Sequence, residues 1–214
     1  RIREFIFIRC SWKYMGSIVP PQAKDSPMTL TTDYSGNMIY EAGSLKMILI
    51  DDGYITFSGT TPVYHYYLKD HLGNNRMVVR ADGTVEQTNS YYPFGGWFFG
   101  INYTDAQPYK YNGKELDHMH GLDWYDYGAR HYDPYLARWM CMDPKAEKYY
   151  DVSPYAYCGN NPVNKIDPDG KEVDIVHRTG FLGLGKKETL KYDDGSLYNK
   201  DGSEDKDNSR RIEI

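Results

Sequence analysis

The feature that most constrains the fold is the stretch 109–170, in which tyrosines and tryptophans recur at short intervals between turn-forming residues. Large aromatic residues favour pleated, half-buried strands, whereas Gly, Asn and Asp-Pro steps favour turns. No window of this stretch keeps apolar residues at the spacing of an amphipathic helix over several turns. We therefore expect strands and turns, with one short helix over 145–149 that has Asp143 as its N-cap and Pro144 as its first helical residue.

The region before this stretch is expected to form a series of hairpins. From Leu30 onward, short runs rich in β-branched and aromatic residues alternate with turn signals. Asp82-Gly83 is the strongest of these signals, because both positions tolerate a positive φ. The expected strands cover residues 38–40, 45–50, 54–57, 63–68, 77–80 and 84–92. The fold class is therefore all-β, an antiparallel hairpin meander with a disordered, wholly polar C-terminal tail.

Composition narrows the classes of function. The chain has 22 tyrosines among its 214 residues, so much of its buried apolar surface brings a hydroxyl that needs a hydrogen-bond partner. A net charge of −5 argues against nucleic acid as the main partner. No apolar run approaches the length of a membrane span, and we see no signal peptide. The first residue is Arg rather than Met, which indicates a piece of a longer product.

The three cysteines, Cys10, Cys141 and Cys158, do not have the spacing of a disulfide framework or a metal site. Spacing alone leaves a bond between Cys141 and Cys158 open, and buried thiols are the interpretation we favour. No motif for a cofactor or a metal ion stands out, so none is expected. These observations direct attention to the aromatic stretch itself.

Several local signatures follow one another in the aromatic stretch. They are YNGKE at 111–115, GLDWYDYGARHYD at 121–133, RW at 138–139 before DP at 143–144, SPYAYCGNNP at 153–162 and IDPDG at 166–170. In this order the set resembles the core domain that ends the repeats of RHS (rearrangement hotspot) proteins, within the wider YD-repeat family, and it looks most like the version found in Bacteroidetes. The resemblance continues upstream to about Asp33.

The resemblance implies a domain organisation. Residues 1–29 would be an N-terminal strand or linker, 30–108 YD/RHS-type hairpin repeats, 109–170 the RHS core, and 171–214 the truncated start of a variable toxin domain. In RHS proteins the repeats wind into a hollow β-shell that encapsulates a C-terminal toxin, and the core closes the shell. The implied partners are the upstream repeats, the toxin domain and its immunity protein. The implied location is secreted or on the surface of a bacterial cell.

The resemblance also implies a second, enzymatic function. Many RHS cores act as aspartyl autoproteases that release the C-terminal domain. The matching carboxylates here are Asp143 and Asp167, with Arg138 expected to hold one of them ionised and the cut expected after Gly170 or Lys171.

A simpler interpretation stands beside this one, in which each Asp-Pro step only begins a turn or caps a helix. The step Asp133-Pro134 fits that interpretation.

Other patterns are weighed against simpler interpretations. His118 and His120 lie beside carboxylates but are expected to be turn residues rather than metal ligands, and His65, His71 and His131 are expected to be structural. The glycine-rich run 180–185 lacks the Lys-Ser/Thr of a phosphate loop and is expected to be a flexible connection. The aromatic density permits a carbohydrate-binding module, although strand spacing favours interior packing. Residues 97–99 are the expected exposed apolar patch.

Overall fold

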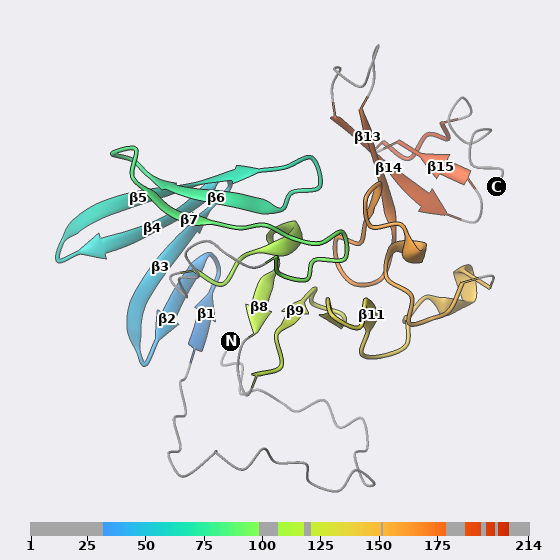
Figure 1. The fold of residues 1–214 in the computed structure, drawn as a ribbon, viewed down its shortest axis with the longest axis horizontal. Helices are drawn as coiled ribbons and strands as arrows, with labels where there is room; N and C mark the ends of the chain where they lie inside the picture. The colour runs from blue at the N-terminus through green and yellow to red at the C-terminus, as the bar shows by residue number, and fades with distance from the viewer. Residues whose placement is uncertain are drawn as a thin grey trace, which may run out of the picture. The chain divides into compact units, whose positions relative to one another are not determined.

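The computed structural model describes residues 32–98, 107–117, 121–150, 152–178, 187–193, 196–199 and 201–205 (Figure 1). The expected N-terminal strand or linker therefore lies outside the described residues. The chain divides into two compact units, one comprising Arg1–Tyr66 with Arg80–Gly83 and the other Tyr67–Val79 with Thr84–Ile214. The all-β prediction is confirmed, since the described residues form antiparallel strands and only three-residue 3-10 turns. The predicted boundaries at residues 29, 108 and 170 stay predictions.

The first unit is a meander in which each strand pairs antiparallel with the next one along the chain. Its strands are β1 (Thr32–Ser35), β2 (Met38–Glu41), β3 (Ser44–Ile50), β4 (Gly53–Ser58) and β5 (Thr61–Lys69), the last of which continues past this unit. Ile39, Met47 and Tyr54 are buried on one side. His65 stacks on Tyr54 at 4.3 Å between ring centroids and hydrogen-bonds Thr56, which is the structural role expected for it.

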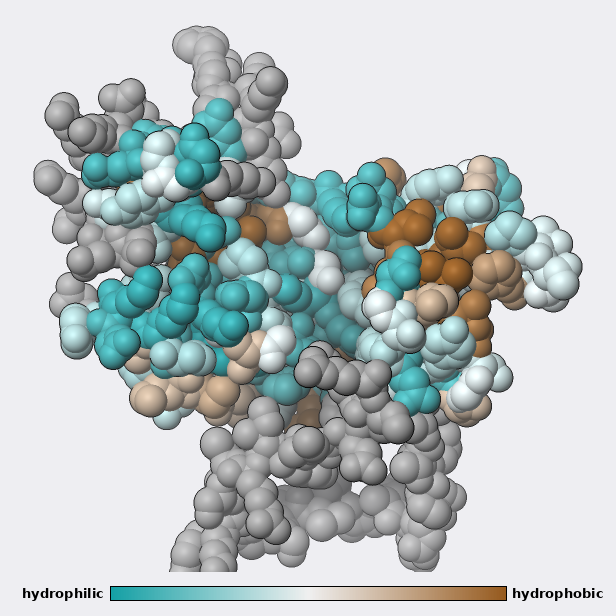
Figure 2. All heavy atoms as spheres, turned by 180° about the vertical axis from the view of Figure 1, so that it is seen from behind, coloured by the Kyte–Doolittle hydropathy of each residue, from teal (hydrophilic) through white to brown (hydrophobic). Residues whose placement is uncertain are grey.

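Apolar side chains also remain on the surface of the first unit. Ile50, Phe57 and Tyr64 are exposed, and the alternation of side chains places them together on the face opposite to Met47 and Tyr54. Figure 2 shows hydrophobic residues gathered on the surface of these strands. An exposed apolar patch of this kind is typical of a surface that contacts another protein element.

Strand β6 (Asn75–Arg80) pairs antiparallel with β7 (Val85–Thr88), and the predicted Asp82-Gly83 turn lies between them in sequence. Both strands belong to the second unit except for Arg80, which, with the turn, is part of the first. The last strand of the expected meander, 84–92, ends early at Thr88. Polar side chains turn the chain there, because Asn89 Nδ2 donates to the Asn75 carbonyl at 2.8 Å and Gln87 Nε2 donates to Asn89 Oδ1 at 2.7 Å.

The aromatic stretch forms a four-stranded sheet of short strands in the order β11-β10-β9-β8. The strands are β8 (Glu115–Asp117), β9 (Trp124–Asp126), β10 (His131–Asp133) and β11 (Arg138–Trp139). Their inward side chains meet in one buried cluster. It comprises Tyr111, Leu116, Tyr125, Tyr127, Tyr132, Trp139, Tyr157 and Cys158. Because such short strands form few ladder hydrogen bonds, this aromatic cluster is the main stabilising element of the sheet.

Buried tyrosine hydroxyls find partners in the cluster. Tyr127 and Tyr157 each donate to Asn112 Oδ1 at 2.7 Å, and Tyr132 donates to the carbonyl of Phe94 at 2.7 Å. The ring of Tyr132 also stacks on Tyr157 at 4.0 Å between centroids. These contacts meet the requirement that the tyrosine-rich composition imposed.

The helix expected over 145–149 is present only as a 3-10 turn, Ala146–Lys148. The residue that precedes this turn is Lys145, so the N-cap expected at Asp143 and the first helical position expected at Pro144 were wrong. Asp143 Oδ1 accepts a hydrogen bond from the Lys145 amide at 2.7 Å. After this single turn the chain continues without helical structure.

A second four-stranded sheet follows, in the order β12-β13-β14-β15. It comprises β12 (Lys165–Ile166), β13 (Asp174–Arg178), β14 (Lys187–Asp193) and β15 (Ser196–Tyr198). Beyond β15, Glu204 forms a bridge with Tyr198, and the rest of the expected disordered tail, 206–211, lies outside the described residues.

Replacing Tyr132 by alanine tests whether the aromatic cluster stabilises the second unit. The Tyr132 side chain is fully buried, so Tyr132→Ala should lower the free energy of unfolding by about 3 to 5 kcal/mol. The nearby Tyr135 is 63% exposed, and Tyr135→Ala should change that free energy by less than about 0.5 kcal/mol. Denaturant titration measures both variants. Equal losses would show that the cluster does not dominate stability.

Candidate functional site

The three Asp-Pro steps all begin turns. Asp133 Oδ1 accepts hydrogen bonds from the amides of Tyr135 and Leu136 at 2.8 and 2.9 Å, as the simpler interpretation expected. Asp143 Oδ1 and Asp167 Oδ1 likewise accept from amides that follow them. Turn formation therefore describes all three steps, but two of them have a further partner.

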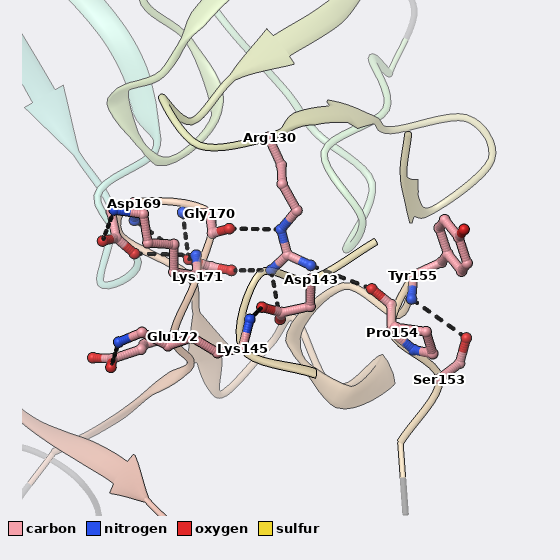
Figure 3. A network of polar contacts seen from close by, with 11 residues as sticks. Arg130, Asp143, Lys145, Ser153, Pro154, Tyr155, Asp169, Gly170, Lys171 and Glu172 are labelled. Carbon is pink, nitrogen blue, oxygen red and sulfur yellow. Dashed lines mark hydrogen bonds and ion pairs between the residues drawn. The ribbon is translucent and has the colours of Figure 1, made fainter. Parts of the chain in front are cut away.

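Asp143 and Asp167 share one guanidinium, that of Arg130. Arg130 Nη2 lies 2.9 Å from Asp143 Oδ2 and 3.0 Å from Asp167 Oδ2. All three side chains are nearly inaccessible to solvent: Arg130 is 2% exposed, Asp143 11% and Asp167 0%. Figure 3 shows the Arg130 side chain reaching between the segment around Gly170 and the segment around Asp143. The structure thus brings together two carboxylates that are distant in the sequence.

Arg130 is held by contacts on every side. Its Nε donates to the Gly170 carbonyl at 2.6 Å and its Nη1 to the Pro154 carbonyl at 3.3 Å. The guanidinium also lies over the Trp139 ring at 4.1 Å from the centroid. A buried guanidinium needs this complete set of acceptors, since an unsatisfied one would strongly destabilise the fold.

Burial is the dominant influence on Asp167. It raises the pKa of this carboxyl from 3.8 to about 6, against the opposing effects of Arg130 and of the amides of Gly170, Lys171 and Asp169. Near neutral pH the site therefore exchanges a proton readily. A carboxyl of this kind is suited to general acid–base chemistry.

The peptide bond between Gly170 and Lys171 lies inside this network. Its carbonyl oxygen accepts from Arg130, and its amide donates to Asp167 Oδ1 at 3.1 Å. Gly170 has a φ of +78°, and a Cβ there would lie 3.0 Å from the Arg130 amide nitrogen. Only glycine combines this backbone conformation with such a close approach to Arg130.

The structure corrects the role expected for Arg138. This side chain is exposed on β11, where its backbone pairs with Asp133 and Ala156. The cation beside the two carboxylates is Arg130 instead. Side chains alternate along a strand, so the burial of Trp139 turns the adjacent Arg138 outward. The sequence analysis missed Arg130. The signal that could have found it is its spacing from Tyr132, because residues two positions apart in an extended chain point to the same side, and both side chains are buried.

A small cavity of about 50 Å³ lies beside the two charged groups. Arg130 and Asp143 contribute to its wall, together with Ser153 and Pro154. A cavity of this volume has room for water, which needs only about 15 Å³, and Arg130, Asp143 and Ser153 are polar groups in its wall.

The histidines and the glycine-rich run were the other candidate sites. His118, His120 and the glycine-rich run 180–185 lie outside the described residues. Within the described part of the chain, no group of three or more His, Cys, Asp or Glu is arranged to hold a metal ion. His131 packs near Trp124 at 6.4 Å between centroids, as a structural histidine.

His71 lies 3.2 Å from the Val163 carbonyl oxygen. No disulfide joins the described residues Cys141 and Cys158, and burial raises the pKa of the Cys158 thiol.

The expected apolar patch at 97–99 is only partly present. Phe98 is 56% exposed, but Trp97 is half-buried and packs against the aromatic cluster, so its assignment to the patch was wrong. Phe99 lies outside the described residues. Six of the twelve Tyr and Trp rings of the aromatic stretch are buried in the cluster, which favours interior packing over a carbohydrate platform. In the part of the chain that is described, no helix has the length and apolarity needed to cross a membrane.

Comparison with known proteins identifies the class. A sequence model of the Teneurin YD-shell family matches residues 24–163, more than half of the chain. The chain therefore belongs to the Teneurin YD-shell family, and the RHS/YD-repeat resemblance is confirmed.

Two relatives show how small a part of a larger protein this chain corresponds to. It is 42% identical to Salivary gland surface protein 1 of Aedes aegypti over 110 residues, which is 50% of this chain and 3% of that protein. It is 31% identical to Toxin subunit YenC1 of Yersinia entomophaga over 129 residues, 58% of this chain and 13% of that subunit. The crystal structure of TcdB2-TccC3-TEV matches with a TM-score of 0.52 and 23% identity, covering 66% of this chain and 8% of that one. This last likeness supports the fold alone.

The raised pKa of Asp167 predicts a visible titration. A carboxyl carbon resonance should titrate near pH 6 in the native protein, and Asp167→Asn should remove it. Because the folded pKa lies above the ordinary 3.8, this group contributes stability that is complete below about pH 4 and is lost as the pH rises through about 6. Carbon-detected NMR measures the titration.

The matched control for this titration is Asp133→Asn, which alters the third Asp-Pro step. That variant should keep the resonance that titrates near pH 6. A titration near pH 4 for every aspartate would contradict the assignment.

Proposed function

We propose that this chain forms the closing end of a YD-type β-shell that encloses a toxin domain of the same larger protein. Membership of the YD-shell family carries this proposal. The similarity to a toxin subunit supports the nature of the enclosed domain. Upstream repeats, a C-terminal toxin domain with its immunity protein, and a secreted or cell-surface location are parts of the same proposal.

The change in strand length along the chain supports a closing role. Strands β1–β7 are four to nine residues long, whereas β8–β11 are two to three residues long. Long hairpins in sequence order extend a sheet, but very short strands fixed by a buried aromatic cluster cannot propagate it. The exposed apolar residues of the first unit are suited to contact with further repeats.

Electron microscopy of the longer natural protein tests this proposal. The 109–170 region should lie at one end of a hollow β-shell, with the exposed apolar residues of the first unit covered by neighbouring repeats. Ile50→Asp together with Phe57→Asp should lower the yield of closed shells, because charge would be buried against apolar surface. A separate globular domain outside any shell would refute the proposal.

The Arg130 network favours a second function, self-cleavage between Gly170 and Lys171. The two ends of that bond contact a cation and a carboxyl respectively, an arrangement that turn formation alone does not require. This function is compatible with the first, because a shell that encloses a toxin domain can also cut it free.

The chemistry would proceed by attack of water on the Gly170 carbonyl carbon. Asp143, which lies beside Arg130, would accept the water proton, and Arg130 Nε would stabilise the negative charge that develops on the Gly170 oxygen. Asp167, protonated near its pKa of about 6, would give its proton to the Lys171 nitrogen as the carbon–nitrogen bond breaks. The products are a Gly170 carboxylate and a Lys171 amine.

Intact mass measurement of the longer natural protein tests self-cleavage. A fragment ending at Gly170 should form, and Asp167→Asn should slow its formation by about a hundredfold or more, the usual effect of losing a general acid. The rate should fall as the pH rises above about 6, because Asp167 then loses the proton that it must donate.

Two variants serve as matched controls. Asp133→Asn changes another Asp-Pro step and Arg138→Ala removes an exposed cation, and both should leave the rate unchanged. Uncut protein at every pH would end this proposal without affecting the proposed shell.

A further inference from the structure

The loop that follows Asp167 is held through its amide groups. Three consecutive amides, those of Asp169, Gly170 and Lys171, donate to Asp167 Oδ1 at 3.3, 2.7 and 3.1 Å. A carboxylate oxygen that accepts several amide hydrogens orders the backbone around it, because each bond restricts one peptide group. The nitrogen side of the Gly170–Lys171 bond is therefore fixed by Asp167.

The carbonyl oxygens of the same loop have three different donors. The pairs, donor first, are Lys114 Nζ with Pro168, the Ala129 amide with Asp169 and Arg130 Nε with Gly170, at 2.5, 3.2 and 2.6 Å. Two of these donors are side-chain cations, which form stronger hydrogen bonds than neutral groups do. Lys114 is the cation of this pair to which the reaction proposed above gives no role.

A short turn places the backbone of Lys114. The 3-10 turn Tyr111–Gly113 directly precedes it, and the Lys114 amide donates to the Tyr111 carbonyl at 2.9 Å. Within this turn, Asn112 Oδ1 accepts the Tyr127 hydroxyl at 2.7 Å. The turn is therefore anchored to the aromatic cluster, and the lysine extends from a fixed point.

The aromatic cluster also guides the Lys114 side chain. Its ammonium nitrogen lies 5.1 Å from the centroid of the Tyr127 ring, and a cation over an aromatic face is attracted to it. Burial lowers the pKa of this ammonium, whereas the carboxylates of Asp167, Asp126 and Asp169 oppose that lowering. Lys114 therefore interacts with Asp167 through charge as well as through the loop.

The peptide group between Pro168 and Asp169 connects Lys114 to Asp167. Its oxygen accepts from Lys114 Nζ, and its N–H donates to Asp167 Oδ1. Hydrogen bonds that share one peptide group polarise each other, so each is stronger in the presence of the other. Loss of the lysine would free this peptide group and loosen the carboxyl that lies against the Lys171 nitrogen.

We propose that Lys114 is a positioning residue for self-cleavage, which holds the Pro168 carbonyl and thereby keeps Asp167 against the Lys171 nitrogen. Its hydrogen bond is to a residue two positions before the bond that breaks, so it acts through Asp167. This role rests on the self-cleavage proposed above, whereas the contact of Lys114 with the loop does not.

Several charged or titratable groups surround Asp167 and Lys114. They are Arg130, Asp143, Cys158, Asp126, Asp169 and Lys171. Arg130 holds the loop and contacts the Gly170 oxygen, so its removal would disturb the whole site at once. Lys114 can be changed while every acceptor of Arg130 is kept, which makes it the more informative position to vary.

Two variants of the longer natural protein test the proposal through the rate of self-cleavage at a series of pH values. Lys114→Met removes the donor and the charge, and its highest rate should be about ten- to a hundredfold lower. Loss of the cation also disfavours ionised Asp167, so the decline in rate should move upward by about half a pH unit or more. Lys114→Arg keeps the donor and the charge, and its decline should stay near pH 6. Intact mass followed over time measures each rate.

A purely structural role would lower the rate of Lys114→Met without moving its pH dependence, and that result would overturn the proposal. The matched control is Lys46→Met, which removes a lysine of the first unit that pairs with Glu41 at 2.9 Å. This control should change neither the rate nor its pH dependence. A shift of the same size in the control would also count against Lys114.

If the longer protein stays uncut, the self-cleavage proposal fails, and the hold of Lys114 on Asp167 is tested without it. The carboxyl resonance expected near pH 6 should titrate at a higher pH in Lys114→Met and at the same pH in Lys114→Arg. Hydrogen exchange of the Gly170 and Lys171 amides should be faster in Lys114→Met alone. If either the titration or the exchange of Lys114→Met is unchanged, Lys114 does not position Asp167.

Discussion

The arrangement of residues 130–170 depends on one buried guanidinium. Arg130 can be buried only if each of its donors has an acceptor, because desolvating an unpaired cation would cost more than the fold could supply. Its acceptors come from three separate segments, at Asp143, at Pro154 and at Asp167 to Gly170. Satisfying this single side chain therefore fixes where those segments lie around the aromatic cluster, with Trp139 below it.

The same interaction explains why the turn and catalytic interpretations of the Asp-Pro steps do not exclude each other. In both Asp143 and Asp167, Oδ1 accepts from the following amides and Oδ2 faces Arg130. In each aspartate, Oδ1 therefore stabilises the turn and Oδ2 forms the ion pair with Arg130. Burial raises the pKa of the Asp167 carboxyl more than Arg130 lowers it, so Asp167 keeps its proton to a higher pH than an exposed aspartate does.

Much of this architecture follows from sequence because the governing signals are local. Alternation and turn residues predicted the hairpins, and glycine and aromatic spacing predicted the β character of 109–170. The pairing of Asp143 with Asp167 came only from family resemblance. Arg130 was missed because the sequence does not show which of two nearby arginines is buried. Arg130 lies directly before β10, whereas Arg138 lies on β11 beside the buried Trp139 and therefore points outward. The early end of β7 was missed because it depends on contacts with Asn75.

Chain boundaries and sheet boundaries do not coincide in the second unit. Strand β12 precedes the Gly170–Lys171 bond in sequence, yet it pairs with β13, which follows that bond. A loop beginning at Asp167 connects them, and its carbonyl and amide groups reach Arg130 rather than a sheet. The pairing of β12 with β13 therefore does not run through the Gly170–Lys171 bond, and the connection is held by Arg130 and Asp167 instead.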